Sequence, residues 1–418
     1  MAREFAPDLM EKIRARFAHV KECPVQGPRV FFENAGGALT LNSVVETSVK
    51  YAAIPDNQGR DNPASHALGR VIARAKSDMA VMMNAPSGQF FLGESGTELL
   101  FRLISAACLA RPERGKVLGS TLEHPASRSA AARWARVARQ VHVLVTHDND
   151  TGTVTVEDYA PEISPDLAVA TILHTSPVTG MAVDVAAIAA RIRAVAPDCL
   201  IIVDGIQHAA HGQIDIASYG VDGYVISPYK MFSRHGYGLA WISDRLAGLP
   251  HNMLIGGPEE NWEMGTRDTG AYAALSDVAA YLEWLGGEVS DDADTRARIT
   301  AAGAAIHDHE AALTAAMIHG TGNLPGLVDM PGVTILGGVD NPAREGLVSL
   351  TVAGVDPADV VARLNEQGIR THLRKADHYS SNILDPLGLS GCVRVSLCHY
   401  NSLKEVARFL SLMQEIAG

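Results

Sequence analysis

A lysine, an aspartate and a short Ser-Gly-Thr run each follow directly after an apolar segment of this chain, where each could do chemistry. Lys230 ends the stretch Ser227-Pro228-Tyr229-Lys230, which comes after the apolar segment 223–226. A lysine at the end of a strand is ordinarily a solvated surface charge. If it is shielded from water, its amine can instead form a Schiff base with a carbonyl compound. Taken alone, Lys230 leaves both interpretations open.

The other two positions could bind a charged ligand. Asp204 follows the apolar segment 200–203 and precedes Gly205-Ile206-Gln207. Its carboxylate could cap a loop, the commoner role of a lone aspartate, or pair with a protonated heterocyclic nitrogen. Ser95-Gly96-Thr97 lies between the apolar segment 89–92 and an apolar helix. The free N–H groups and the dipole of a helix start can bind a phosphate, although serine and threonine also begin many helices for structural reasons.

The apolar segments before these residues are predicted β-strands. Seven such runs, separated by amphipathic helices such as 186–195, lie at residues 89–92, 117–119, 141–145, 167–173, 200–203, 223–226 and 238–242. Continuous apolar strands that alternate with helices indicate a mostly parallel sheet covered on both faces. Ligands of such α/β sheets bind at the carboxyl ends of the strands. We therefore expect Lys230, Asp204 and Ser95 to meet at one edge of the sheet.

The pattern changes after about residue 290. An Ala-rich helix at 292–318 precedes strands at 333–336 and 347–352, then a helix, two more strands and a last helix at 403–416. Asp356 is the predicted N-cap of the middle helix, and Pro357 suits its first turn. We predict a large domain at 31–290, a small C-terminal α+β domain at 291–418, and an N-terminal segment at 1–30 that packs with the small domain.

Composition narrows the class of protein. The 418 residues include 35 Lys and Arg against 47 Asp and Glu, a formal net charge of −12, and no basic cluster suggests a nucleic-acid partner. No apolar run reaches the roughly 18 to 20 residues that span a bilayer. The N-terminus lacks the apolar core of a secretory signal, so a cytoplasmic protein is expected. Five scattered cysteines, with no C-x-x-C pair, argue against a disulfide framework and a metal site.

Taken in order, the motifs resemble those of fold-type I pyridoxal 5'-phosphate (PLP) enzymes, and more narrowly the class V aminotransferase family, which includes cysteine desulfurases and selenocysteine lyases. The motifs are Phe32–Gly37, Leu122–Ser127, Val203–Gln207, Ser227–Lys230, Glu263–Thr266 and Val393–Ser396 with Tyr400-Asn401. The resemblance implies an α/β fold-type I PLP-dependent transferase. Its large domain would contain a mostly parallel seven-stranded sheet, and its small C-terminal domain would be α+β.

The resemblance also implies a role for each motif. Lys230 would hold PLP as a Schiff base and move the Cα proton, Asp204 would keep the pyridine nitrogen protonated, and His124 would stack on the ring. Gln207 would bind the phenolic oxygen of the cofactor. Ser95, Gly96, Thr97, Ser227 and Tyr229 would bind the cofactor phosphate, and Thr266 would bind the phosphate of a neighbouring subunit. Arg394 would bind the substrate α-carboxylate. Other parts of the substrate would contact Asn34, Arg60 and His378. The role of Thr266 implies a homodimer with shared sites.

One departure from the family limits the expected reaction. Desulfurase-like members carry a nucleophilic cysteine on a loop before the strand of Arg394, and the corresponding segment 374–381 contains none. Cys392 lies within the strand itself, so persulfide transfer is not expected. A proline, Pro177, also stands where relatives often have an asparagine near the phenolic oxygen. In the emptied loop, Arg374 is either solvated or suited to a substrate with an acidic side chain.

These observations lead to three hypotheses about function. The first is an aminotransferase whose small-molecule substrate is an amino acid that reacts at its Cα–H bond. The second is a PLP-dependent lyase or an epimerase, because all three reactions begin at the same bond and differ in its alignment with the cofactor ring. The third is a non-catalytic protein with the same fold, which predicts loss of Lys230 or Asp204. Both residues are present.

Overall fold

The computed structural model describes residues 3–111, 113 and 115–418. The seven predicted strands form one sheet, in the order β4-β10-β9-β8-β7-β5-β6. Neighbouring strands run parallel except at β10, which is antiparallel to both β9 and β4. The strands are β4 (Gln89–Gly93), β5 (Lys116–Ser120), β6 (Val141–Val145), β7 (Leu167–Leu173), β8 (Leu200–Asp204), β9 (Gly223–Ile226) and β10 (Gly238–Ile242). The predicted mostly parallel α/β sheet is confirmed.

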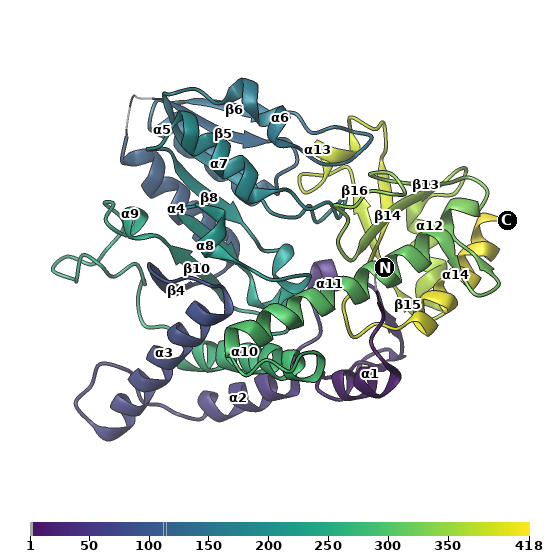
Figure 1. The fold of residues 1–418 in the computed structure, drawn as a ribbon, viewed down its shortest axis with the longest axis horizontal. Coiled ribbons are helices and arrows are strands. Elements are labelled where there is room, and N and C mark those ends of the chain that lie inside the picture. The colour runs from purple at the N-terminus through teal and green to yellow at the C-terminus, as the bar shows by residue number, and fades with distance from the viewer. Residues whose placement is uncertain (1–2, 112, 114) are drawn as a thin grey trace.

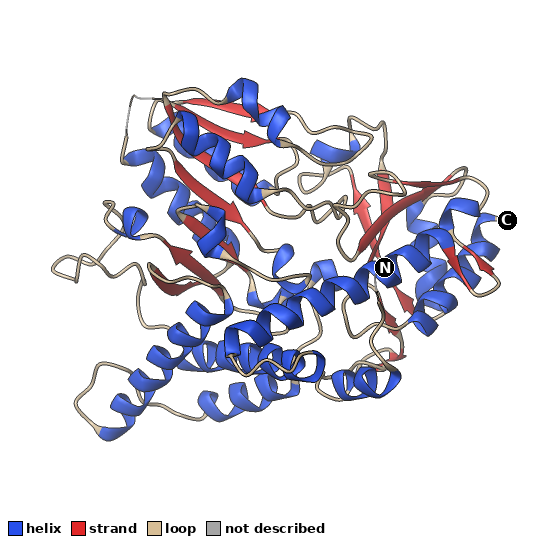
Figure 2. Cartoon of the chain, in the orientation of Figure 1, coloured by secondary structure: helices blue, strands red, loops and turns tan. Residues whose placement is uncertain are grey.

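Helices cover both faces of this sheet (Figures 1 and 2). Successive side chains of a strand point to opposite faces, so Ile201 and Val203 of β8 enter one apolar cluster while Leu200 and Ile202 enter the other. The first cluster includes side chains of α3 (Pro63–Met82), α7 (Val185–Val195) and α10 (Thr269–Val289). The second includes side chains of α4 (Gly96–Leu109) and α5 (Pro125–Val137). Burial on both faces explains why these strands are apolar throughout.

A smaller antiparallel sheet follows in the C-terminal part, in the order β13-β14-β17-β16. Its strands are β13 (Val333–Ile335), β14 (Leu347–Val352), β16 (His372–Lys375) and β17 (Gly391–Ser396). Side chains of α12 (Pro357–Glu366) and α14 (Leu403–Ala417) share an apolar cluster with β14 and β17. Asp356 caps α12 as predicted, because its carboxylate accepts a hydrogen bond of 2.8 Å from the Ala358 N–H.

The N-terminal residues contact this C-terminal part. Strand β3 (Val30–Phe31) pairs in parallel with β15 (Ile369–Arg370). Arg14, the last residue of α1 (Pro7–Arg14), donates to the carbonyl of Tyr400 at 2.7 Å and to Glu405. The long helix α11 (Thr295–His319) runs from α10 toward the smaller sheet (Figure 1). The proposed domain boundaries at residues 30 and 290 stay a prediction.

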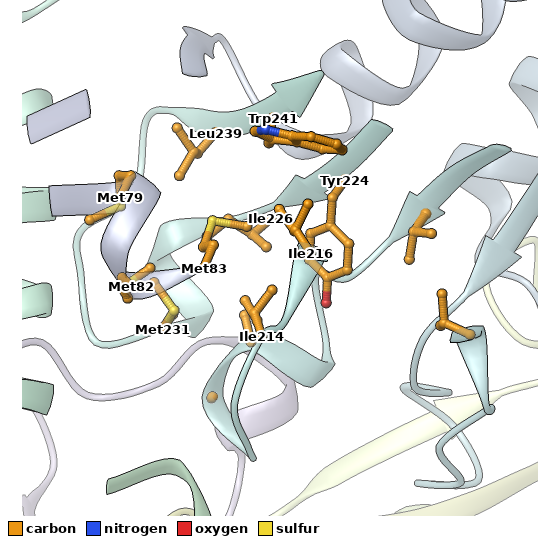
Figure 3. Close-up of a cluster of buried hydrophobic side chains, with 14 of the residues drawn as sticks. Met79, Met82, Met83, Ile214, Ile216, Tyr224, Ile226, Met231, Leu239 and Trp241 are labelled. Carbon is orange, nitrogen blue, oxygen red and sulfur yellow. The ribbon is translucent and has the colours of Figure 1, made fainter. Parts of the chain in front are cut away.

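A buried cluster holds the backbone next to Lys230 in place. Figure 3 shows Met79, Met82 and Met83, at the end of α3, beside Met231 and the strand residue Ile226. Met231 follows Lys230 directly and is buried. The short 3-10 helix η4 (Pro228–Lys230) is therefore fixed on both sides, by β9 before it and by Met231 after it.

Shorter elements make the remaining connections. They are β1 (Glu22–Cys23), β2 (Gly27–Pro28), η1 (Asn34–Gly36), α2 (Asn42–Ala52), α6 (Val156–Tyr159), η2 (Ala160–Glu162), η3 (His208–Ala210), α8 (Ile216–Tyr219), α9 (Asp244–Ala247), β11 (Gly320–Thr321), β12 (Leu324–Pro325), η5 (Leu327–Asp329) and α13 (Ser381–Leu384). Among the helices of the described residues, none has the length and apolar character needed to cross a membrane.

Candidate active site

A cavity of about 420 Å³ lies where residues that follow β5, β7 and β9 face strands β16 and β17 of the smaller sheet. Its lining includes His124, Tyr229, Lys230, Arg374 and Arg394. These residues come from four separate parts of the chain. The large sheet thus contributes the lysine and the smaller sheet contributes both arginines.

Lys230 is partly buried at the large-sheet side of this cavity. Its Nζ donates a hydrogen bond of 3.1 Å to Oε1 of Gln207. Burial, reinforced by the positive charge of Arg394, lowers the pKa of Lys230 to about 7, although Asp204 opposes the shift. A large share of the amine is therefore neutral near pH 7, which is the form that attacks a carbonyl group.

Asp204 is the last residue of β8, and only 2% of it is exposed. Its Oδ1 accepts from the Ile206 N–H at 3.1 Å, and Oδ2 accepts a longer hydrogen bond of 3.4 Å from the Ser127 hydroxyl. Burial raises the pKa of Asp204 to about 6, while the Ile206 N–H and the charge of Lys230 lower it. A buried carboxylate with so few donors fits a protonated ring nitrogen as its partner.

His124 and Gln207 lie beside these two residues. His124 caps α5, since its Nδ1 accepts a hydrogen bond of 3.1 Å from the Ala126 N–H. Burial lowers the pKa of His124 to about 3, with smaller effects from the charges of Lys230 and Arg374. The ring is therefore neutral, which suits stacking on an aromatic cofactor rather than proton transfer. Gln207 is buried and accepts from Lys230, as described above.

The expected phosphate site brings together the start of α4 and the residues after β9. Ser95 caps α4 by accepting from the Glu98 N–H at 3.1 Å. A Cβ atom on Gly96 would lie 2.5 Å from the Ser227 hydroxyl oxygen and 2.6 Å from Cδ1 of Ile206. A Cβ there would have to push these two side chains aside, so glycine keeps the helix start close to Ser227, where its N–H groups can bind an anion. Thr97 is exposed at the same helix end.

Arg394 lies in the middle of β17, with 2% of it exposed. Its Nη1 donates to the carbonyl oxygen of Pro177 at 2.9 Å, and its Nε has no partner among the described residues. Burial, followed by the nearby charge of Arg374, lowers the pKa of Arg394 to about 9. The backbone carbonyl of Pro177 thus holds the guanidinium of Arg394 in place, although the proline side chain has no hydrogen-bond donor for the cofactor. The free edge of Arg394 suits a carboxylate.

Tyr229 lies beside Lys230, and its expected contact with a phosphate stays a prediction. It lines the cavity, and its ring stacks on His235 with 4.3 Å between the ring centroids. Of the predicted site residues, all of them within the described part of the chain, only His124, Tyr229, Lys230 and Arg394 line the cavity. Asp204, Gln207 and the other expected phosphate residues lie outside its lining, and so do the expected substrate and partner contacts Asn34, Arg60, Thr266 and His378. Of these last four, Asn34 is buried and the other three are exposed.

The amide of Asn34 is occupied by contacts within the protein. Its Nδ2 donates to the carbonyl of Ser396 at 2.8 Å and to Oδ1 of Asn401 at 3.2 Å, and its Oδ1 accepts from the Tyr400 hydroxyl. These bonds join the N-terminal segment to β17 and the residues after it. Ala35 and Gly36, the next two residues, reach the cavity in its place.

The exposed three lie on connecting segments. Arg60 is in the loop between α2 and α3, at the lower left of Figure 1. Thr266 is in the long connection between α9 and α10. His378 lies after β16 and packs on Tyr379, with 4.0 Å between the ring centroids. The segment 374–381, expected as a loop, begins as strand, because Arg374 and Lys375 belong to β16.

Sequence reasoning missed a buried polar network behind Gln207. The amide nitrogen Nε2 of Gln207 lies 3.1 Å from Nε2 of His211. The other ring nitrogen of His211, Nδ1, lies 2.7 Å from Oε2 of Glu310. A second pair joins Nδ1 of His208 to Glu345 at 2.8 Å. Burial alone lowers the pKa of His208, but the Glu345 carboxylate raises it above its usual value. The His208 and His211 spacing was visible in the sequence, but nothing there indicated their distant glutamate partners.

Comparison with known proteins extends over nearly the whole chain. A family model described as aminotransferase class-V matches residues 30–409. A probable cysteine desulfurase of Pseudomonas putida is 27% identical over 374 residues, which cover 84% of this chain and 85% of that protein. The nonribosomal peptide synthetase-like enzyme fsqF of Aspergillus fumigatus is 25% identical over 402 residues, or 92% of this chain. The chain spans 25% of the length of that protein.

The fold also matches a solved structure. A cysteine desulfurase from Thermococcus onnurineus NA1, solved in its apo form, superposes with a TM-score of 0.82 at 21% sequence identity. The match covers 100% of this chain and 99% of that one. The seven-stranded sheet and the smaller antiparallel sheet are thus a fold that cysteine desulfurases share.

Proposed function

Because the chain belongs to the class V aminotransferase family, whose members depend on pyridoxal phosphate, we propose that it transforms an amino acid at its Cα atom as an aminotransferase. The observation that carries the proposal is the cavity in which Lys230, with its pKa lowered to about 7, lies beside Gln207 and across from Arg394. Asp204 completes the set as a buried carboxylate at the end of β8.

Each of these side chains has a task in the proposed reaction. When bound, pyridoxal phosphate supplies a protonated ring that withdraws electrons from Cα. Lys230 would hold the cofactor through its amine and, when free, would take and return the proton at the substrate Cα. Asp204 keeps the ring nitrogen protonated. Arg394 holds the α-carboxylate of the substrate with two parallel hydrogen bonds.

The reaction we propose uses no cysteine nucleophile. All five cysteines of the chain are buried, and none lines the cavity within the described part of the chain. Burial raises the pKa of Cys392, on the strand of Arg394, to about 11, so its thiol stays protonated. A thiolate is the form that attacks sulfur. These facts support transamination over persulfide transfer.

A lyase acting by β-elimination, or an epimerase, is the alternative, and the names of the relatives favour the lyase. The Pseudomonas putida relative carries the name probable cysteine desulfurase. Elimination and transamination both begin when Lys230 removes the Cα proton, and they differ in the bond that breaks next. The residues of the cavity suit both.

One experiment separates these reactions. The cofactor-loaded protein is incubated with a panel of amino acids and no keto acid. A transaminase converts at most one equivalent per site to the amine form of the cofactor and then stops, whereas a lyase releases ammonia over many turnovers. Lys230→Ala is the control and should do neither. A wild-type protein that takes up no pyridoxal phosphate would show that the proposal is wrong.

We also propose that two copies of the chain form a homodimer. Thr266 and Arg60 are exposed, and the same connection that holds Thr266 also carries two exposed apolar side chains, Leu254 and Ile255. In a dimer, Thr266 of one copy would reach the phosphate site of its partner. This arrangement accounts for the distance of Thr266 and Arg60 from the cavity of their own chain.

A further inference from the structure

Strands β16 and β17 present two arginines on one face. In their antiparallel register His372 lies opposite Arg394, and Arg374 lies opposite Cys392. Residues directly opposite each other share a face of the sheet, and so do residues two apart on one strand. Arg374 and Arg394 therefore point the same way, into the cavity that Lys230 closes on its other side.

Arg374 is poorly satisfied by the protein. Its Nη2 donates a long hydrogen bond of 3.4 Å to the carbonyl of Tyr379, and its Nε has no partner among the described residues. Burial lowers the pKa of this guanidinium. A guanidinium has five N–H donors, and withdrawing them from water without acceptors is destabilising. The fold itself therefore gains little from an arginine at this position.

The cavity is also richer in positive charge than one carboxylate requires. Besides Lys230, its lining includes three cationic residues, Arg374, Lys375 and Arg394, and one acidic residue, Asp377. Glu33 is outside the lining, and its Oε1 lies 3.0 Å from Nδ1 of His372, which lines the cavity. Asp377 is exposed and accepts from the Tyr379 N–H. This cationic wall belongs to a chain with a formal net charge of −12.

The charge of Arg374 reaches the reacting groups. It contributes to the lowered pKa of His124, of Lys230 and of Arg394. Its guanidinium therefore lies near the place where the substrate must bind. If Arg394 holds the α-carboxylate, Arg374 remains on the same wall as a second cation that forms no ion pair within the described part of the chain.

We propose that the substrate is an amino acid whose side chain ends in an acidic group, and that Arg374 binds this group while Arg394 binds the α-carboxylate. The inference rests on the proposed function and specifies its substrate class. Arg374 is thereby a specificity-determining residue. The guanidinium also suits the planar, two-oxygen shape of a carboxylate.

The test compares acidic amino acids with their neutral amides, which have nearly the same shape. For the cofactor-loaded protein we expect kcat/KM to be about 10- to 100-fold higher for aspartate than for asparagine, or for glutamate than for glutamine, as for a charged hydrogen-bonded pair. Arg374→Gln should remove this preference by lowering kcat/KM for the acidic member alone. Arg374→Lys should restore part of it.

Binding without turnover gives an independent readout. Succinate has two carboxylates and no amine, so it should occupy both arginines, whereas succinamate should occupy one. Calorimetry of the cofactor-loaded protein should show tighter binding of succinate, and Arg374→Gln should reduce succinate affinity to that of succinamate. Arg363→Gln, which removes the same charge from the exposed face of α12, is the matched control and should change neither affinity.

The outcomes separate this inference from the proposed function. Turnover of amino acids with equal kcat/KM for acid and amide would overturn the role of Arg374 and leave the proposed function in place. An equal loss for every substrate in Arg374→Gln would also overturn it, because a merely structural role predicts that pattern. Failure to bind cofactor would instead overturn the proposed function, and succinate binding to the cofactor-free protein, whose cavity both arginines line, would still report on Arg374.

Discussion

Burial sets the charge state of the ionisable side chains in the cavity. Desolvation shifts the pKa of Lys230, Asp204 and His124 in the direction that favours the neutral form of each side chain. The resulting pKa values are about 7 for Lys230, about 6 for Asp204 and about 3 for His124. The amine and the carboxylate therefore both titrate near neutral pH, while the imidazole does not. Desolvation thus makes Lys230 a better nucleophile, leaves Asp204 able to pair with a cation, and keeps the His124 ring neutral.

The pKa of Lys230 predicts how cofactor attachment depends on pH. The unfolded amine titrates near its ordinary value of 10.5 and the folded one near 7. Between these values the unfolded chain binds more protons, so the stability of the cofactor-free protein should rise with pH in this window. The rate of covalent attachment of pyridoxal phosphate should rise through about pH 7 and then level off, as followed by visible absorbance. A rate that keeps rising to pH 10 would contradict the lowered pKa.

Asp204→Asn tests the carboxylate at the end of β8. Asparagine keeps the shape and can still accept from the Ile206 N–H, so the protein should fold and retain the cofactor. The neutral amide cannot hold the ring nitrogen protonated, and we expect kcat to fall about 100-fold or more. Thermal unfolding serves as the control. Near wild-type kcat in Asp204→Asn would exclude the proposed role.

The roles of Lys230, Asp204 and Arg394 were predicted from the order of the motifs, which resembles that of a known family, because the position of one polar residue at a strand end left several interpretations open. The sequence did not predict that Asn34 is occupied within the protein, since its partners Ser396 and Asn401 are distant in the chain. The position of Arg374 on a strand was missed for a related reason. The segment has no apolar alternation strong enough to indicate β16.

At the level of elements, close approach of backbones defines the phosphate end of the site. A Cβ atom on Gly96 would meet Ser227 and Ile206, and one on Gly238 would lie 2.5 Å from the carbonyl carbon of Ser95. Strand β10 can thus pack against the start of α4 only because position 238 is glycine, and Gly96 lets the same helix start approach Ser227 and Ile206. The glycines hold the helix start against the residues after β9, where the anion is expected.

Gly96→Ala should therefore move α4 relative to Ser227. We expect a loss of about 1–3 kcal/mol in the free energy of unfolding, as for other overpacked sites, together with weaker binding of pyridoxal phosphate. Gly69→Ala is the matched control, because Gly69 lies exposed within α3 and a Cβ there has open space around it. That change should stabilise the helix slightly. Equal unfolding free energies for the two variants would contradict this account of the packing.

The strands could be predicted from their apolar runs, but the direction of β10 could not. A parallel neighbour needs a crossover of a dozen or more residues, usually a helix. Residues 227–237 connect β9 to β10 and include only the short η4, so the chain reverses. The short connection between β9 and β10 is visible in the sequence, but it does not specify which strands lie next to each other in the sheet. The strand order, with β4 at one edge beside β10, depends on packing that no local pattern records.

For the whole molecule, the proposed dimer makes a direct prediction. The connection before Thr266 carries Leu254, which is 67% exposed, and Ile255, which is fully exposed. Replacing both with aspartate should give a monomer in sedimentation experiments and lower cofactor affinity, because Thr266 would no longer reach a partner. Secondary structure should not change. A wild-type protein that sediments as a monomer would exclude shared sites.

The joining of the two chain ends has a consequence for synthesis on the ribosome. The hydrogen bond from Asn34 to Ser396 cannot form until the ribosome has added 362 further residues, and β3 cannot pair until β15 has been made. At roughly 5–20 residues per second, the start of the chain stays without its partners for about 20 to 70 s. During that time the large sheet can form, but the wall that carries both arginines does not yet exist. The nascent chain therefore has a lysine exposed to aldehydes before it has any means of selecting a substrate.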